Sequence, residues 1–246
     1  MERYELTPIG NCYDYSQGPY TSWYIVLENS LYLFDVPYST AAWFLTKKGK
    51  SLINKVDRII VFITSLKESR IGGLKTLIDI LVTINKPRMV YIPTEIWMKA
   101  SNYLEIVGAN MPDCHLMRGD YYQDDNVQIF PREVVHDGII RSFAYMIYGG
   151  DLFINQTGSN WSTYYSPDNR IFMDESVLES FLNEPAEKTI YHDMTYNIND
   201  ETHCYKERVS KVIKKDLRSH IYPIDISDPK DVKKFKTQGF NVVMPE

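Results

Sequence analysis

Five apolar residues stand in succession from Ile59 to Ile63. A strand with one face in water alternates apolar and polar side chains, so an unbroken run is typical of a strand buried on both faces. Helical patterns over 39–54 and 71–84 flank this run, the first with Ser39 or Thr40 as its expected N-cap. This region is therefore predicted to be a sheet covered by helices.

The rest of the chain repeats this kind of pattern. Strands come first, then strand–helix units, then strands and strand–helix units again, which makes two similar halves. The predicted fold class is α/β: an αββα sandwich of two mixed sheets face to face with helices outside, in one domain over 1–246. The further expected segments are strands over 4–7, 20–27, 31–36, 90–93, 127–130, 132–136, 143–147, 152–156, 189–192, 221–225 and 241–244, helices over 94–109, 174–183, 202–215 and 229–237, and a hairpin turn at Gly149-Gly150.

Composition narrows the class of protein. Hydrophobic residues make up 44% of the chain and charged residues 24%, which is typical of a globular domain and excludes intrinsic disorder. The net charge of −5 argues against general nucleic-acid binding, although it leaves room for a local basic pocket. Three widely spaced cysteines favour the reducing cytoplasm, and the lack of a leader or a long apolar run predicts no membrane association.

Six local motifs, in the same order as in a known family, resemble the metallo-β-lactamase fold. Within it, they resemble the branch that contains tRNase Z and the phage anti-Pycsar cyclic-nucleotide phosphodiesterases. The third motif keeps the family's flanking threonine and Gly-Gly-Leu, which fixes its register. The motifs are Pro8-Ile9-Gly10, Thr21–Tyr24 with Leu33-Phe34-Asp35, Ile63–Leu74, Val135–Gly138 with Ser142–Tyr145, His192–Tyr196 and Ile221–Ser227.

The resemblance implies a two-metal hydrolase site, but the ligand positions have changed. The positions of the first four ligands carry Ser65, Lys67, Ser69 and Arg70, that of the bridging aspartate carries Ser159, and that of the last histidine carries Asp225; His136 alone is kept. Serine is a poor zinc ligand, and ammonium and guanidinium groups repel a cation. We therefore expect no metal, no cofactor and no catalytic residue.

Lys67 and Arg70 place positive charge at positions where the family binds ions. They could form an anion pocket, since a guanidinium fork and an ammonium hold phosphate without a metal. Alternatively they could pair with Asp193 and Asp225 and fill a vacated cavity, because buried charges must be paired. The predicted ligand-binding set is Ser65, Lys67, Ser69, Arg70, His136, Ser159, His192, Asp193 and Asp225.

Several other side chains have both a ligand-binding and a structural interpretation. His136 and the pair His192 and Asp193 could contact a ligand or be structural. The remaining histidines, His115, His203 and His220, are interpreted as ordinary polar residues. An aromatic cluster in an expected loop could stack a base or form a dimer contact, and we expect a homodimer. The cluster comprises Trp161, Tyr164 and Tyr165.

Three classes of function follow. The first is a metal-free pseudoenzyme that binds, and by sequestration neutralises, a nucleotide-type or other small anionic ligand, as a phage counter-defence protein would. The second is a protein-interaction module with a filled pocket, whose partner is a host protein. The third is a phosphodiesterase-like hydrolase in which His136, His192 and Asp225 regroup around one metal. The intact frame with its Ser, Lys and Arg substitutions favours the first.

Overall fold

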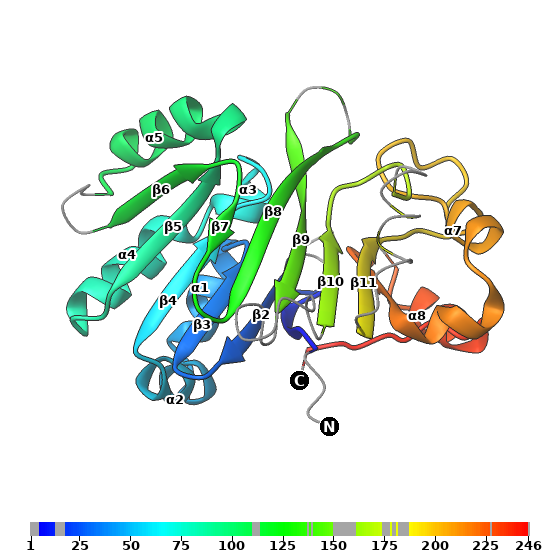
Figure 1. Ribbon diagram of the computed structural model, residues 1–246, viewed down its shortest axis with the longest axis horizontal. Helices are drawn as coiled ribbons and strands as arrows, with labels where there is room; N and C mark the ends of the chain where they lie inside the picture. Colours follow the sequence, from blue (N-terminus) through cyan, green and yellow to red (C-terminus); the bar gives the residue numbers. More distant parts are fainter. Residues whose placement is uncertain are drawn as a thin grey trace. The chain divides into compact units, whose positions relative to one another are not determined.

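The structure is a computed structural model that describes residues 5–12, 18–109, 114–136, 138, 140–149, 161–173, 178, 181, 187–226 and 228–245. The chain divides into two compact units. Unit 1 is Met1–Asp120 with Met244–Glu246, and unit 2 is Tyr121–Val243. Each unit contains one six-stranded sheet, whose strands run side by side in Figure 1.

Unit 1 has the strand order β1-β2-β3-β4-β5-β6. Its first three strands are antiparallel, and β3 to β6 are parallel, so the sheet is mixed. The helices follow the parallel strands in sequence, as crossover connections do. The strands are β1 (Thr7–Gly10), β2 (Ser22–Leu27), β3 (Ser30–Phe34), β4 (Arg58–Phe62), β5 (Arg88–Pro93) and β6 (His115–Gly119); the helices are α1 (Tyr38–Phe44), α2 (Lys47–Lys55), α3 (Glu68–Ile71), α4 (Leu74–Thr83), η1 (Thr94–Ile96) and α5 (Trp97–Ile106).

The apolar run is strand β4, and its burial confirms the prediction. Residues Ile59 to Phe62 are at most 2% exposed. Strand β4 lies between β3 and β5, and Phe34 of β3 stacks on Phe62 with ring centroids 5.3 Å apart. Because β3 and β4 are parallel neighbours, the residues that follow them emerge at the same edge of the sheet.

The helix expected over 39–54 is two helices. The first ends at Phe44 with Leu45 as its C-cap. Thr46 caps the second, α2, because its hydroxyl accepts a hydrogen bond from the Gly49 N–H at 3.2 Å. The expected N-cap at Ser39 or Thr40 was wrong, since both lie inside α1, which begins after Pro37. Proline fixes its own backbone and resists continuation of a helix on its N-terminal side.

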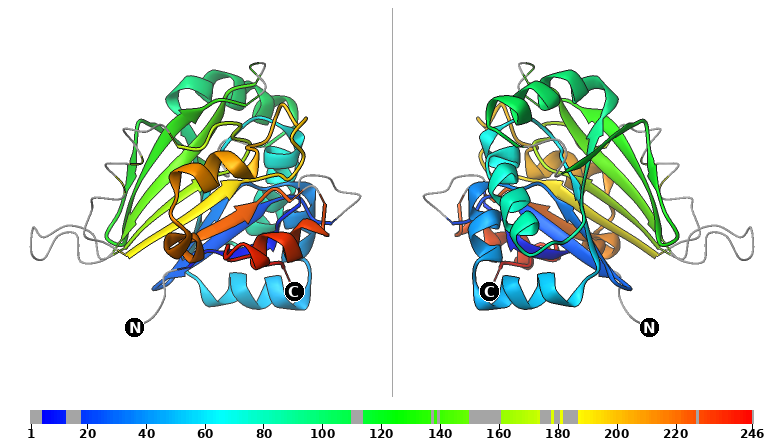
Figure 2. Two further views of the ribbon diagram at one scale, coloured as in Figure 1. Left: turned by 90° about the vertical axis from the view of Figure 1, so that its right-hand side faces the viewer. Right: turned by 90° about the vertical axis from the view of Figure 1, so that its left-hand side faces the viewer.

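Unit 2 has the strand order β12-β11-β10-β9-β8-β7. Strands β10, β11 and β12 are parallel to one another, and the other pairs are antiparallel. Figure 2 shows the helices of this unit, α7 in orange and α8 in red. The strands are β7 (Tyr122–Gln123), β8 (Val127–Val134), β9 (Ser142–Gly149), β10 (Trp161–Ser166), β11 (Glu187–Asp193) and β12 (Ile221–Ile224); the helices are α7 (Lys206–Val212), η3 (Lys215–His220) and α8 (Asp231–Thr237).

Several sequence expectations in unit 2 are corrected. The two strands expected over 127–136 are one strand, β8, which carries Pro131 in its middle. The expected strand over 241–244 is irregular chain. The helix expected over 202–215 is shorter, and a 3₁₀ segment follows it. The expected strand over 152–156, Gly150 of the expected turn, and most of the helix expected over 174–183 lie outside the described residues.

The aromatic cluster lies on strand β10 and not in a loop. Trp161, Tyr164 and Tyr165 are each at most 3% exposed within the structure. Aromatic side chains favour strands, and these three are buried within the sheet of unit 2, so the expectation of an exposed loop was wrong.

Among the helices of the described residues, none is long and apolar enough to cross a membrane.

Candidate functional site

In unit 1, a buried carboxylate organises the carboxyl ends of β3 and β4. Asp35 follows β3 directly, and its carboxylate accepts hydrogen bonds from the Thr64 N–H at 2.8 Å and from the Thr64 hydroxyl at 2.7 Å. Arg70 Nε lies 4.0 Å from Asp35 Oδ2, and Arg70 donates to the carbonyl of Thr21 at 3.2 Å. Asp35 is 0% exposed and Arg70 is 1% exposed. The guanidinium is thus a buried cation with an acidic partner in its own unit.

The four predicted site residues of unit 1 lie in one short segment. Ser65 is fully buried, and its hydroxyl accepts from the Lys67 N–H at 3.4 Å. Lys67 is the residue before α3 and is half-buried, as is Ser69 within that helix. The main chain of Arg70 also holds this segment in place, since its carbonyl accepts a hydrogen bond from the Val36 N–H at 2.6 Å. These bonds tie residues 65–70 to the loop that begins at Asp35.

In unit 2, three aspartates gather at the carboxyl ends of the parallel strands. Asp193 ends β11, Asp225 follows β12, and Asp168 comes two residues after β10. Asp225 Oδ2 accepts from the Asp168 N–H at 3.1 Å, and Asp193 Oδ2 accepts from the Asn169 N–H at 3.1 Å. All three aspartates are at most 1% exposed. Parallel strands deliver their final residues to one edge, which explains why residues far apart in sequence meet here.

Positive φ marks the chain at two of these aspartates and at Asp35. The φ angles are +64° at Asp35, +50° at Asp168 and +56° at Asp225. Aspartate is one of the few residues other than glycine that adopt this region readily, because its side chain can hydrogen-bond locally. The turned backbone brings an acidic side chain to the strand end in each unit. Backbone strain of this kind is concentrated at functional sites.

Two histidines complete the cluster of unit 2. His203 Nδ1 lies 2.7 Å from Asp193, and His136 Nδ1 donates to the carbonyl of Thr202 at 2.9 Å. His136 Nε2 is 4.0 Å from Asp168 Oδ1, and the two imidazole centroids are 6.1 Å apart. Both histidines are at most 4% exposed. The cluster is therefore a buried network of three carboxylates and two imidazoles: Asp168, Asp193, Asp225, His136 and His203.

The pKa values of Asp193 and His203 are both raised, although burial and charge oppose each other at each residue. Burial raises the pKa of Asp193 to about 7, even though the His203 cation opposes the shift. Burial also disfavours charge on His203, but the neighbouring carboxylate of Asp193 outweighs that effect and raises the pKa of His203 to about 9. The pair consequently retains a proton at neutral pH and releases it in alkaline solution.

His192 lies on the opposite face of β11 from Asp193, because consecutive residues of a strand alternate. Its ring packs edge-on against Phe172 with centroids 5.0 Å apart, and it is 0% exposed. Neither ring nitrogen has a hydrogen-bond partner among the described residues. Burial lowers the pKa of His192 to about 3, so the imidazole is neutral. The structure therefore separates His192 from the acidic cluster.

Sequence reasoning missed His203, Asp168 and Asp35. Interpreting His203 as an ordinary polar residue was wrong, because it is 2% exposed and bonded to a buried aspartate. The sequence did contain a signal for His203. Asp193 ends a buried strand, so its carboxylate requires a hydrogen-bond donor, and His203 follows it after a short connection. Ser159 lies outside the described residues.

The two-metal centre implied by the resemblance does not fit these residues. Arg70 is a buried cation paired with Asp35, and the neighbouring ligand positions carry Ser65, Lys67 and Ser69. No group of three or more His, Cys, Asp or Glu side chains in the described parts of the chain is arranged to hold a metal ion. A regrouped site at His136, His192 and Asp225 is therefore absent from these residues.

Comparison with solved structures defines the class: the chain has the metallo-β-lactamase fold, which confirms the predicted α/β class with two mixed sheets and helices. It is similar to a diphosphatase of the PhnP family over 97% of its length and 94% of that chain, with a TM-score of 0.68 and 16% identity. It is similar to the metallo-β-lactamase fold protein YhfI from Bacillus subtilis over 98% and 96%, with a TM-score of 0.68 and 9% identity.

The short form of human tRNase Z is a third similar structure. The similarity covers 97% of this chain and 96% of that one, with a TM-score of 0.66 and 14% identity. No family model matches the sequence, and no curated protein matches it. At these identities the likeness establishes the fold alone.

Proposed function

We propose that this protein is a metal-independent binding protein of the metallo-β-lactamase fold that takes a small anionic ligand of the nucleotide type. The observation that carries the proposal is segment 65–70, in which the family frame is kept while Lys67 and Arg70 replace metal ligands. An ammonium group binds a phosphate group directly, so the charge of Lys67 can take the place of a metal ion at this position.

Two features support a phosphate-bearing ligand. The segment is rigidly placed, because Asp35 and Thr64 anchor it from the strand ends. Two of the similar structures are a diphosphatase and a tRNase Z, whose names refer to a diphosphate or a tRNA. Sequestration of a cyclic nucleotide, in the manner of a phage counter-defence protein from the tRNase Z and anti-Pycsar branch, is the most specific form of this proposal.

Lys67 and Arg70 have different roles in this proposal. Lys67 is half-buried, and it supplies the ammonium that contacts the anion. Arg70 is 1% exposed and bonded within unit 1, so it positions the segment. Removal of the Lys67 charge should therefore weaken binding with little effect on folding, because a charge near solvent contributes little to stability.

Calorimetric titration with cyclic mononucleotides, cyclic dinucleotides and their linear counterparts tests the proposal. We expect at least one to bind with micromolar affinity and Lys67→Gln to weaken that binding about tenfold, or about 1.4 kcal/mol. Lys75→Gln is the matched control, since Lys75 pairs with Asp79 on the surface of α4. Absence of binding across the panel at high micromolar concentration would refute the proposal.

A second candidate is a protein-interaction module whose interior is filled. The buried Arg70–Asp35 and His203–Asp193 pairs favour it, since both units already neutralise their buried cations internally. Capture of one specific host protein by the purified chain, with a nucleotide panel that gives no heat, supports this candidate. A clear nucleotide ligand with no captured protein counts against it.

A further inference from the structure

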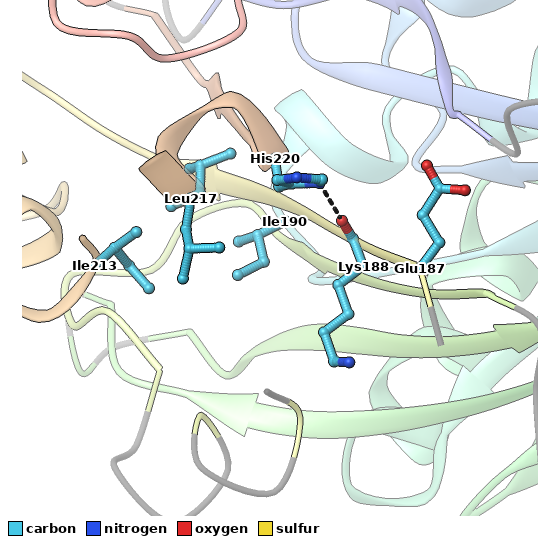
Figure 3. A pocket seen from close by; sticks show the side chains of 7 residues that line it. Glu187, Lys188, Ile190, Ile213, Leu217 and His220 are labelled. Atoms are coloured by element: carbon cyan, nitrogen blue, oxygen red, sulfur yellow. Dashed lines mark hydrogen bonds between the residues drawn. The ribbon is translucent and has the colours of Figure 1, made fainter. Parts of the chain in front are cut away.

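A pocket lies in unit 2 at the beginning of strands β11 and β12, whereas the acidic cluster lies at their carboxyl ends. Its volume is about 360 Å³, within the range of small-molecule sites. None of its residues occupies a position that the family resemblance assigns to a metal ligand. The lining residues, shown in Figure 3, are Glu187, Lys188, Ile190, Ile213, Leu217, His220 and Ile221.

The floor of the pocket is aliphatic. Ile190 and Ile221 are direct partners in the parallel pairing of β11 and β12, so both side chains project from the same face of the sheet. Ile213, which follows α7, adds a third buried side chain, and each of the three is at most 3% exposed. Leu217 of η3 is 38% exposed and forms the outer wall. An apolar body placed here would itself be removed from water and would cover the exposed part of Leu217.

The rim of the pocket carries the ammonium group of Lys188, on the face of β11 from which Ile190 projects. Lys188 comes two residues before Ile190, so its side chain leaves β11 on the same face. Glu187 leaves the strand in the opposite direction, as Figure 3 shows. The carbonyl of Lys188 accepts a hydrogen bond from Nδ1 of His220 at 3.1 Å. Since Nδ1 carries the proton, Nε2 of a neutral His220 is an acceptor.

We propose that this pocket binds a small amphipathic anion. The apolar body of the ligand packs on Ile190, Ile213, Leu217 and Ile221, and its acidic head lies at the Lys188 ammonium. Each buried methylene adds favourable transfer free energy, and the ammonium discriminates an anionic head from a neutral one. This binding site is independent of the function proposed for segment 65–70, because it uses other residues.

Titration of the full chain with octanoate and 1-octanol, followed by NMR of the isoleucine methyl groups, tests this site. We expect octanoate to shift the signals of Ile190, Ile213 and Ile221 in a saturable manner, while those of Ile59 and Ile60 in unit 1 stay unmoved. 1-Octanol, which has the same chain without the charge, should bind about five- to tenfold more weakly. No saturable shift with either compound, or equal affinity for both, would overturn the proposal.

Two variants and a matched control make the test specific to the site. Leu217→Trp fills the pocket from its exposed wall and should weaken octanoate binding at least tenfold. Lys188→Gln should weaken octanoate binding about fivefold and leave 1-octanol binding within twofold. Lys233→Gln, at an exposed lysine of α8, should change neither. Unchanged octanoate binding in Leu217→Trp with a native isoleucine spectrum would place the ligand elsewhere and reject this assignment.

Discussion

Nδ1 of His203 lies 2.7 Å from both carboxylate oxygens of Asp193, and both side chains are at most 2% exposed. A short bond between buried groups of opposite charge satisfies each partner only while the other is present. This pair connects the end of β11 to the segment that precedes α7. It is the best-defined interaction in the cluster of unit 2.

Removal of one partner should therefore be costly. We expect His203→Gln and Asp193→Asn each to lower the free energy of unfolding by about 3–5 kcal/mol, because a charged group is left buried without its counterpart. The double variant should cost much less than the sum of the two. Urea denaturation of the four proteins measures this coupling, and additive losses would show that the two residues act independently.

The same pair sets a pH dependence of stability. The pKa of His203 is raised to about 9 in the folded protein, above its ordinary value of 6.5. Its contribution is therefore fully present below pH 6.5 and is lost as the pH rises through 9. We expect wild-type stability to fall by about 3 kcal/mol between pH 6.5 and 9.5 for this reason, since one unit of pKa difference corresponds to about 1.4 kcal/mol.

Thermal melts over that range test the pH dependence, with the double variant His203→Gln/Asp193→Asn as the comparison, because the buried Asp193 carboxyl would itself titrate in the single variant. The double variant should be less stable at pH 6.5, and its melting temperature should change little from pH 6.5 to 9.5. An equally steep alkaline decline in the variant would assign the titration to another group.

A separate prediction concerns Arg70, the buried guanidinium of unit 1. Arg70→Ala should cost about 3–5 kcal/mol, because it leaves the Asp35 carboxylate buried beside Thr64 without its cation. Lys75→Ala, which removes an exposed ion pair, should cost at most about 1 kcal/mol. Chemical denaturation compares the two variants. A loss within about 1 kcal/mol for Arg70→Ala, together with weaker nucleotide binding, would instead describe an open anion site.

Substitution of His192 should have the opposite effect on stability from substitution of the charged pairs. Both of its ring nitrogens are buried without a hydrogen-bond partner in the described part of the chain, so His192→Phe removes an unsatisfied polar group beside Phe172. We expect the variant to be as stable as the wild type or more stable, by up to about 2 kcal/mol.

The stability difference between His192→Phe and the wild type should grow as the pH falls. With its pKa lowered to about 3, wild-type His192 stays neutral when folded and takes up a proton on unfolding, so it destabilises the fold as the pH falls below 6.5. Melting temperatures of both proteins from pH 7 to 4.5 measure this effect. A variant that is less stable at every pH would mean that a bound group satisfies the imidazole.

Metal removal should leave the protein unchanged. The donor set at the family's ligand positions includes Lys67 and Arg70, so we expect EDTA or added zinc to move the melting temperature by less than about 1 °C. Less than about a tenth of an equivalent of metal should co-purify with the chain. Restoring four positions by Ser65→His, Lys67→His, Ser69→Asp and Arg70→His should not create phosphodiesterase activity, since Ser159 and Asp225 remain.

Segment 65–70 and strand β4 could be interpreted from local sequence. The apolar run 59–63 is short and rich in β-branched residues, which favours a strand buried on both faces over a segment of buried helix. The intact frame around residues 65–70 fixed the register in which substitutions of the ligands were recognised. The class of fold was predictable for the same reason, since it depends on the order of such segments.

The partners of buried charges were decided by tertiary structure alone. Asp35 and Arg70 meet because the parallel strands β3 and β4 bring their carboxyl ends to one edge, and Asp193 meets His203 because the chain that follows β11 returns to the end of that strand. The backbone turns that aim these side chains leave no periodic signal in the sequence. The aromatic side chains of β10 likewise resemble loop residues locally and became core only when β9 and β11 paired on either side. Sequence determined which segments had to be buried, and the long-range pairing of strands determined which charges were buried together.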